Sequence, residues 1–101
     1  MASKRSKACD ISSKVRQEVL KRDENQCIIC GTSYGLQIAH YISRARGGLG
    51  IAQNLATMCV SCHFQMDNGK YHKELQKCVR EHLQEHYPDW DEKNLTYNKW
   101  R

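Results

Sequence analysis

The sequence predicts a small α+β fold, and three observations lead to this class. The chain has only 101 residues, which is enough for one domain with a modest core. Apolar residues recur at helical spacing in residues 13–22 and 70–86, whereas residues 36–39 alternate between apolar and polar in the manner of a strand. Two C-x-x-C pairs flank the alternating segment. A short hairpin between flanking helices is therefore expected, with the cysteines as a staple.

The two cysteine pairs predict a structural zinc site. The segments Cys27–Cys30 and Cys59–Cys62 each contain a C-x-x-C pair. Each such turn directs two sulfurs to one point, and two turns complete the tetrahedron that Zn²⁺ accepts. A disulfide or a redox-active C-x-x-C would each leave one pair unexplained. One zinc ion is therefore expected, with four ligands: Cys27, Cys30, Cys59 and Cys62.

Two further cysteines are left over, and the sequence favours a reducing compartment for all six. Cys9 is expected as a free thiol in a tail, and Cys78 as a small core residue of a helix. No stretch approaches membrane-spanning length, and residues 1–7 lack the apolar run of a secretion signal. A cytoplasmic location without a membrane partner is expected, because cysteine pairs in that compartment ordinarily bind metal.

The net charge of +5 is concentrated at the start of the chain. Residues 1–22 hold seven basic side chains against two acidic ones, whereas residues 23–101 hold nine of each. Residues 1–12 are expected to form a basic flexible arm, in which Lys4, Arg5 and Lys7 contact DNA phosphates. The alternative for this arm is a solubilising tail, which charge alone does not exclude.

The first half of the domain is expected to be a helix followed by a strand. Val15, Val19 and Leu20 form the apolar stripe of a helix over residues 13–22, with a serine as its cap and basic side chains facing outward. Residues 36–42 are rich in strand formers, and the far end of this strand presents His40. Residues 43–53 form a loop with three glycines and two arginines.

The second half completes the hairpin and adds two helices. A short strand over residues 55–58 pairs with the first strand, and a helix follows over residues 59–68. This order of knuckle, hairpin and helix is that of a treble-clef zinc fold. A second amphipathic helix occupies residues 70–86, and Pro88 ends it. Residues 87–101 are expected to be a polar tail with three possible docking aromatics: Trp90, Tyr97 and Trp100.

Three residues of this unit suit the binding of a cation and the activation of water. His63 directly follows a zinc-binding cysteine, so the staple would hold it at the first turn of a helix. Asp67 lies four residues later on the same helical face, and the pair suits a divalent cation such as Mg²⁺, Mn²⁺ or Ni²⁺. A neutral His40 beside a cation-bound phosphodiester could take a proton from water.

The loop between the strands adds groups that suit phosphate binding. Arg44 and Arg46 would hold phosphates, and two neighbouring glycines would let the backbone approach them. Each residue also has an ordinary interpretation when it is taken alone. A histidine can be a packing residue, Asn54 can cap a loop, and an arginine–glycine run can be an exposed turn. The functional interpretation rests on all of them occurring in order within one zinc-framed unit.

This ordered motif, within residues 13–69, resembles the zinc-ribbon, four-cysteine branch of the HNH endonucleases. Its parts are Cys27-x2-Cys30, Ala39-His40, Gly47-Gly48, Asn54-Leu55 and Cys59-x2-Cys62-His63. The resemblance implies a ββα-metal fold and a metal-dependent nuclease that nicks or cleaves DNA. By the match, His40 is the general base, Asn54 orients the loop and His40, and His63 binds the catalytic ion. Small members of this family are common in bacteriophage genomes, often near packaging functions, so packaging proteins are candidate partners.

The sequence departs from the family at one position. The residue before the catalytic histidine is often Asp or His, a second ligand of the catalytic ion, and here it is Ala39. Asp67 is the expected substitute, because it shares a helical face with His63.

The expected organisation is an arm over residues 1–12, a zinc-ribbon HNH nuclease domain with flanking helices over residues 13–86, and a tail over residues 87–101. The predicted function is metal-dependent hydrolysis of DNA phosphodiesters. One alternative is a non-catalytic zinc module that binds DNA through the arm and the arginine loop. Another is a protein-interaction domain that uses the aromatic tail. The sequence predicts neither the oligomeric state nor the cleavage site.

Overall fold

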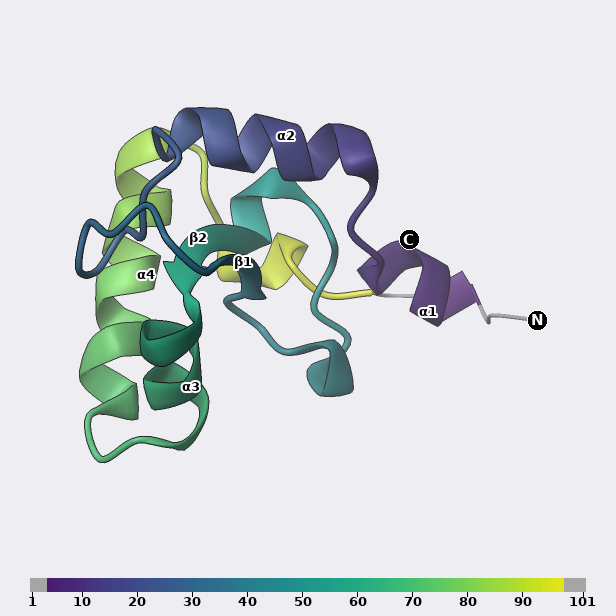
Figure 1. The fold of residues 1–101 in the computed structure, drawn as a ribbon. Helices are drawn as coiled ribbons and strands as arrows, with labels where there is room; N and C mark the ends of the chain where they lie inside the picture. Colours follow the sequence, from purple (N-terminus) through teal and green to yellow (C-terminus); the bar gives the residue numbers. More distant parts are fainter. Residues whose placement is uncertain (1–3, 98–101) are drawn as a thin grey trace.

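The structure, a computed structural model, describes residues 4–97 and places a two-stranded sheet between helices. In chain order the elements are α1 (Lys4–Cys9), α2 (Ser13–Arg22), β1 (Leu36–His40), the 3-10 turns η1 (Arg44–Arg46) and η2 (Ala52–Asn54), β2 (Leu55–Cys59), α3 (Val60–Asn68), α4 (His72–His86) and the 3-10 turn η3 (Glu92–Asn94). Figure 1 shows α2 across one side of the hairpin and α3 with α4 on the other. The small α+β class that the sequence predicts is confirmed.

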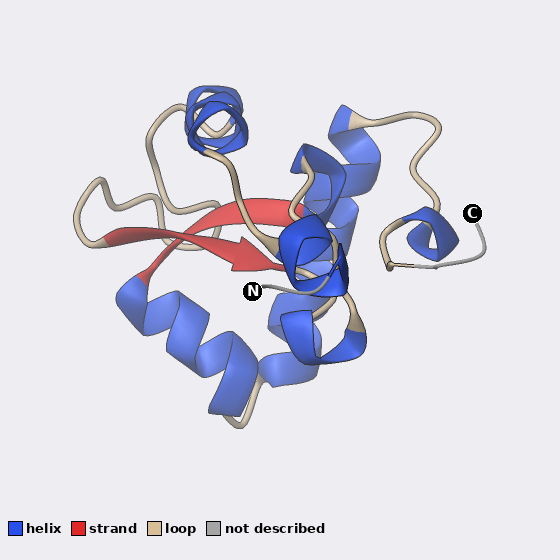
Figure 2. Cartoon of the chain, turned by 90° about the vertical axis from the view of Figure 1, so that its right-hand side faces the viewer, coloured by secondary structure: helices blue, strands red, loops and turns tan. Residues whose placement is uncertain are grey.

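The hairpin is antiparallel, with His40 opposite Leu55 and Ala39 opposite Ala56. Because side chains alternate across a strand, each face of the sheet has its own core. The face under α2 packs a cluster of Val19, Ile38, Ala52 and Leu55. The other face packs against α3 and α4 through Ala39, Ala56, Met58, Met66, Val79 and Leu83. Figure 2 shows the two strands between these layers. His40 ends β1 opposite Leu55 and is half-buried.

The bounds of α2 follow the prediction, but the direction of its last side chain does not. Ser12 caps the helix, and its hydroxyl accepts a hydrogen bond from the Val15 amide at 3.1 Å. Arg22 was expected to face outward, yet its side chain is only 10% exposed. Its guanidinium donates to the carbonyls of Ala52 and Leu55 and so ties α2 to the second strand. A guanidinium carries five donors, which lets one buried arginine satisfy several carbonyls at once.

Asp23 follows α2 and connects three elements. Its carboxylate accepts from Arg22 at 2.8 Å, from the Thr57 amide at 2.9 Å and from His82 of α4 at 2.8 Å. Burial raises the pKa of Asp23, but the hydrogen bonds from His82, Arg22 and Thr57 outweigh it and hold the pKa well below its ordinary value. This charged network holds α2, β2 and α4 together.

The two ends of the chain are more ordered than the sequence suggests. Residues 4–9 form α1 rather than the expected arm without structure, and Cys9 is buried rather than a thiol in a tail. The expectation for Cys78 is also wrong, because its side chain is exposed on α4. No helix within residues 4–97 is long and apolar enough to cross a membrane.

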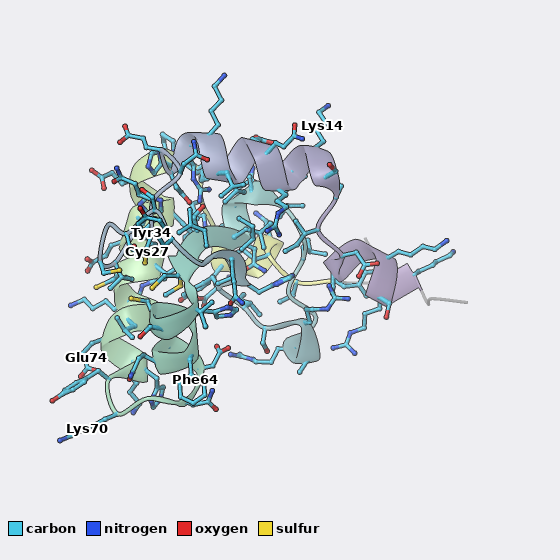
Figure 3. The ribbon with its side chains drawn as sticks, in the orientation of Figure 1. Lys14, Cys27, Tyr34, Phe64, Lys70 and Glu74 are labelled. Carbon is cyan, nitrogen blue, oxygen red and sulfur yellow. The ribbon has the colours of Figure 1, made fainter. Side chains whose placement is uncertain are left out.

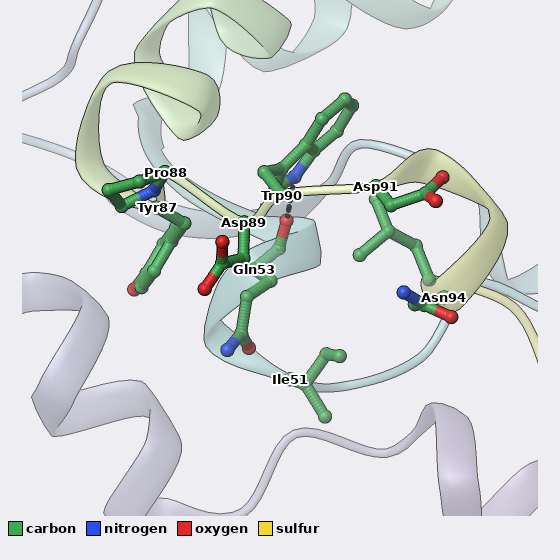
Figure 4. Close-up of a pocket in the computed structure, with 9 residues that line it drawn as sticks. Ile51, Gln53, Tyr87, Pro88, Asp89, Trp90, Asp91 and Asn94 are labelled. Atoms are coloured by element: carbon green, nitrogen blue, oxygen red, sulfur yellow. Dashed lines mark hydrogen bonds between the residues drawn. The ribbon is translucent and has the colours of Figure 1, made fainter.

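The segment after α4 folds back onto the loop between the strands. The Trp90 indole donates to the Gln53 carbonyl at 2.8 Å, at the edge of a cavity of about 310 Å³ (Figure 4). Leu95 is buried, and Thr96 forms a bridge with Gly48. Of the three proposed docking aromatics, Trp90 is therefore used within the domain. The Tyr97 amide donates to the Gly47 carbonyl, and Trp100 lies outside the described residues.

Candidate functional site

The four cysteines of the two C-x-x-C turns come together, as the sequence predicts. Their sulfur atoms all lie within 4.8 Å of one another and gather beside Cys27 in Figure 3. The sulfurs of Cys30 and Cys59 are 3.7 Å apart. A tetrahedron with Zn–S bonds of about 2.3 Å has edges of about 3.8 Å, so the spacing fits a zinc ion. Cys59 also caps α3, because its sulfur accepts from the Cys62 amide at 3.4 Å. The cluster therefore fixes the start of α3.

The ionisation of the thiols also suits a dication. Burial raises the pKa of Cys27, but hydrogen bonds from the backbone of Cys30, Cys59 and Ile29 outweigh it and lower the pKa to about 7. Burial and the neighbouring sulfurs raise the pKa of Cys62. Four thiolates this close together repel one another, and a bound zinc ion removes that repulsion.

His63 and Asp67 come together on one face of α3. The Nε2 atom of His63 is 3.4 Å from Oδ2 of Asp67. The Nδ1 atom of His63 is 2.8 Å from Oε1 of Gln37 on β1. Since an amide oxygen only accepts, Nδ1 carries the proton, and in the neutral ring the lone pair on Nε2 is then on the side of the Asp67 carboxylate. These two atoms are the donors that a divalent cation would use, and Gln37 orients the imidazole.

His40 stands at the end of β1, beside the C-terminal end of α1. Its Nε2 atom is 2.9 Å from the carbonyl oxygen of Cys9. Burial lowers the pKa of His40 below its ordinary value. The Cys9 contact opposes this shift, and the positive charge of Arg44 and the His63 side chain lower the pKa further. Burial and the neighbouring charge of Arg44 thus favour the neutral form of the His40 ring.

Asn54 is fully buried at the end of η2 and makes contacts only within the domain. Its side-chain oxygen accepts from the Ile42 amide at 2.8 Å, and its nitrogen donates to the carbonyls of Ile42 and Leu49. Its own carbonyl accepts from Tyr41 at 2.7 Å. Gly48 must lack a side chain here, since a Cβ would lie 1.6 Å from the Ile42 carbonyl oxygen. Asn54 thus joins Ile42, where the loop after His40 begins, to Leu49 within that loop.

Ala39 precedes His40 at the position where the family often has a ligand. Its side chain is 1% exposed and packs in the core with Met58 and Met66. It supplies no donor atom to a cation. The donors that the structure brings together are on α3, at His63 and Asp67.

Comparison with known proteins agrees with this geometry. The HNH endonuclease family model matches residues 27–69, which run from the first zinc-site cysteine to the end of α3. The chain contains an HNH endonuclease domain. Among solved structures it is similar to the Type IV phosphorothioation-dependent restriction endonuclease ScoMcrA, with 25% identity and a TM-score of 0.62. That match covers 75% of this chain and only 17% of the larger protein. No curated protein matches the chain.

The basic residues predicted to contact DNA lie at the edge of the HNH domain. Arg44 donates to the Cys9 carbonyl at 2.7 Å and forms a 2.6 Å ion pair with Asp10. Arg5 of α1 donates to the Ala45 carbonyl at 2.8 Å. Arg5 and Arg44 thus line one small polar depression on this side of the domain. The other three residues are exposed on α1 or η1: Lys4, Lys7 and Arg46.

A second group of donors lies beside the HNH domain. Asp23, His82 and His86 hold ligand atoms within 4.8 Å of one another. Both oxygens of Asp23 are already occupied by Arg22, His82 and Thr57, so the carboxylate acts within the folding network described above.

Sequence reasoning missed three residues that contact the proposed site. Gln37 is a polar residue between the apolar Leu36 and Ile38, and that alternation was a signal that its side chain faces away from the α2 core. Cys9 contacts His40 through its backbone carbonyl. Every residue type has this group, so the sequence could not indicate the contact. Asp10 holds Arg44, and as one acid in a basic segment it gave only a weak signal.

Proposed function

We propose that this HNH domain hydrolyses DNA phosphodiesters, with His40 as general base and His63 and Asp67 as ligands of a divalent cation. The single observation that carries the proposal is the His63–Asp67 pair, held by Gln37 on the helix that the four-cysteine cluster anchors, with His40 at the end of the same strand as Gln37. The match of residues 27–69 to the HNH family supports it.

His40 suits the role of base because burial keeps the ring neutral. Its imidazole would accept a proton from water as the water oxygen bonds to phosphorus, and the opposite P–O bond breaks. A divalent cation bound at His63 and Asp67 would stabilise the negative charge on the leaving oxygen. Nitrogen and carboxylate donors suit Mn²⁺ and Ni²⁺, and Mg²⁺ also binds such sites through water.

Asn54 serves the reaction through position. By holding Ile42 and Leu49, it fixes the loop that carries Arg44 and Arg46 relative to His40. The side chain of Arg44 is 48% exposed, and an exposed ion pair such as the one with Asp10 contributes only about 0–1 kcal/mol. A DNA phosphate can therefore replace Asp10 as its partner. Arg46 and the basic residues of α1 (Lys4, Arg5 and Lys7) would add further phosphate contacts.

The similarity to ScoMcrA supports a nuclease, since that protein is a restriction endonuclease. The alternative is a zinc module that binds DNA without cutting it. Ala39 favours this alternative, because it leaves two protein donors where the family often has more.

Supercoiled plasmid cleavage separates the two functions. Wild-type protein, His40→Ala and His72→Ala are incubated with plasmid and Mg²⁺, Mn²⁺ or Ni²⁺ in turn. His72 lies exposed at the start of α4 and controls for the loss of an imidazole. We expect His40→Ala to cut about 100- to 10,000-fold more slowly, with unchanged zinc content and DNA affinity. Equal nicking by His40→Ala and wild type would remove the proposed mechanism, and no cutting by wild type with any ion would favour the binding module.

A further inference from the structure

We infer that α1, which lies outside the matched residues 27–69, is a positioning element of the nuclease site. Its Cys9 carbonyl fixes the His40 ring with the proton on Nε2 and the lone pair on Nδ1. The inference rests on the proposed role of His40 as the base. It extends the site to a segment outside the residues that the HNH family model matches.

The chemistry of the contact sets the position of the proton. A carbonyl oxygen only accepts hydrogen bonds, so the 2.9 Å contact from His40 Nε2 to the Cys9 oxygen requires a proton on Nε2. In the neutral ring the other nitrogen, Nδ1, is then unprotonated. Nδ1 is therefore the atom of His40 that can take a proton from water.

The end of α1 is well suited to supply this carbonyl. The last carbonyls of a helix have no partner within the helix and must find one elsewhere. In α1 the Ala8 carbonyl accepts from the Gly50 amide at 2.9 Å, and the Cys9 carbonyl accepts from His40 and Arg44. The end of α1 thus completes its hydrogen bonds on the loop and strand of the HNH domain.

Close packing holds the Cys9 carbonyl in place. The Cys9 side chain is only 2% exposed. Gly50 lies so near that a Cβ there would be 2.0 Å from the Asp10 carbonyl oxygen and 3.0 Å from that of Cys9. At the other end of α1, Arg5 reaches the carbonyl of Ala45. The helix is therefore attached to the loop at several points.

One carbonyl sets two functional side chains at once. Arg44 donates to the Cys9 oxygen at 2.7 Å, and its other terminal nitrogen binds Asp10 at 2.6 Å. The Cys9 carbonyl oxygen therefore positions both the proposed base, His40, and Arg44. If this oxygen were displaced, the His40 ring would populate both of its neutral tautomers, and only one of them has an unprotonated Nδ1 that can act as a base.

A matched pair of variants at Ala8 tests this role in the full-length, zinc-loaded protein. Ala8→Pro removes a helical hydrogen bond and clashes with the carbonyl four residues earlier, so it displaces the end of α1 without changing the charge. Ala8→Ser keeps the helix and serves as its control. Gly50→Ala provides a second displacement from the opposite side of the contact. The primary measurement is the ¹⁵N shift of each His40 ring nitrogen, recorded without DNA at a pH where the ring is neutral.

In wild type and Ala8→Ser we expect a protonated-type shift at Nε2 and an unprotonated-type shift at Nδ1. In Ala8→Pro and Gly50→Ala both shifts should move toward intermediate values, and turnover should fall about tenfold or more. A proton on Nδ1 in the wild-type protein would overturn the inference, whatever the variants do. So would unchanged ring shifts in both displaced variants. These readings need no catalysis, so they separate this inference from the proposed function, which is tested by plasmid cleavage with the wild-type protein and His40→Ala.

Discussion

The four-cysteine cluster and the histidine site share one HNH domain, but different parts of the chain assemble them. The sulfurs come from two C-x-x-C turns, and each turn sets half of the cluster over four residues. His40 takes its partner from Cys9, 31 positions earlier, and His63 takes its partner from Gln37, 26 positions earlier. Each half of the cluster is thus set by a local turn, although the two halves meet across 29 positions, whereas each histidine is oriented by a distant segment alone.

Because of this difference, the cluster is expected to govern the stability of the domain, and the histidine site its chemical activity. A structural zinc ion contributes folding free energy directly, and its loss is felt throughout a small domain. The hydrogen bonds that orient the histidines each contribute on the order of 1 kcal/mol, so they can be removed while the fold persists. Substitutions in the cluster should therefore unfold the protein, and substitutions around the histidines should change its activity alone.

The largest effect is expected from Cys59→Ala. This change removes a zinc ligand and the cap of α3. Structural zinc in small domains contributes on the order of 10 kcal/mol of apparent binding free energy, so the variant should be largely unfolded. Circular dichroism and bound zinc per chain measure the outcome.

Cys78→Ala is the matched control, because Cys78 is an exposed thiol on α4. It should keep both the helical signal and one zinc ion. If Cys59→Ala also kept both the helical signal and the zinc ion, the four-cysteine cluster would not be what stabilises the fold. The cluster and the histidine site would then not differ in their effect on stability.

The same contrast explains what the sequence could and could not predict. The helix from Ser13 to Arg22, both strands and α3 follow from periodicity and capping, which act over a few residues. The meeting of His63 and Asp67 follows from helical spacing alone. The order of α1 escaped prediction, because a short basic segment becomes helical only by docking on the loop and strand. Arg22 escaped for a related reason, since its buried partners are backbone carbonyls far along the chain.

The next effect concerns Gln37, which orients His63 from β1. Outer partners of metal-binding histidines typically contribute 10- to 100-fold in metal affinity or activity. Gln37→Ala should therefore raise the Mn²⁺ concentration needed for half-maximal cleavage by about 10- to 100-fold, with zinc content unchanged. Gln17→Ala is the control, because Gln17 is exposed on α2. Equal Mn²⁺ dependence in Gln37→Ala and Gln17→Ala would show that His63 needs no such partner.

A smaller effect is expected from pH, through His40. Burial lowers the pKa of His40, so between the folded and unfolded pKa values the folded protein binds fewer protons than the unfolded one. Stability from this group is therefore present above the unfolded pKa and is lost as pH falls through the folded pKa. Cleavage needs the same neutral ring, so its rate should rise about tenfold per pH unit and level off below the ordinary histidine range near 6.5.

The variant Arg44→Gln sharpens this test. Removing the positive charge raises the pKa of His40, so the rise in rate should move to higher pH while zinc content stays constant. A pH–rate profile for each protein measures the shift. Profiles that coincide would mean that Arg44 does not act on the base.

The smallest effect is expected at Lys4 and Lys7, which are exposed on α1 and act only by charge. Each phosphate contact contributes about 0.9 to the slope of log affinity against log salt concentration. The double variant Lys4→Ala, Lys7→Ala should therefore lower that slope by about 1.8, equally for any DNA sequence, and leave turnover at saturating DNA unchanged. Lys70→Ala with Lys73→Ala removes the same charge at the turn before α4 and at its start. If the α4 pair lowered the slope and the α1 pair did not, the DNA would lie against α4, and α1 would serve the site only by holding His40.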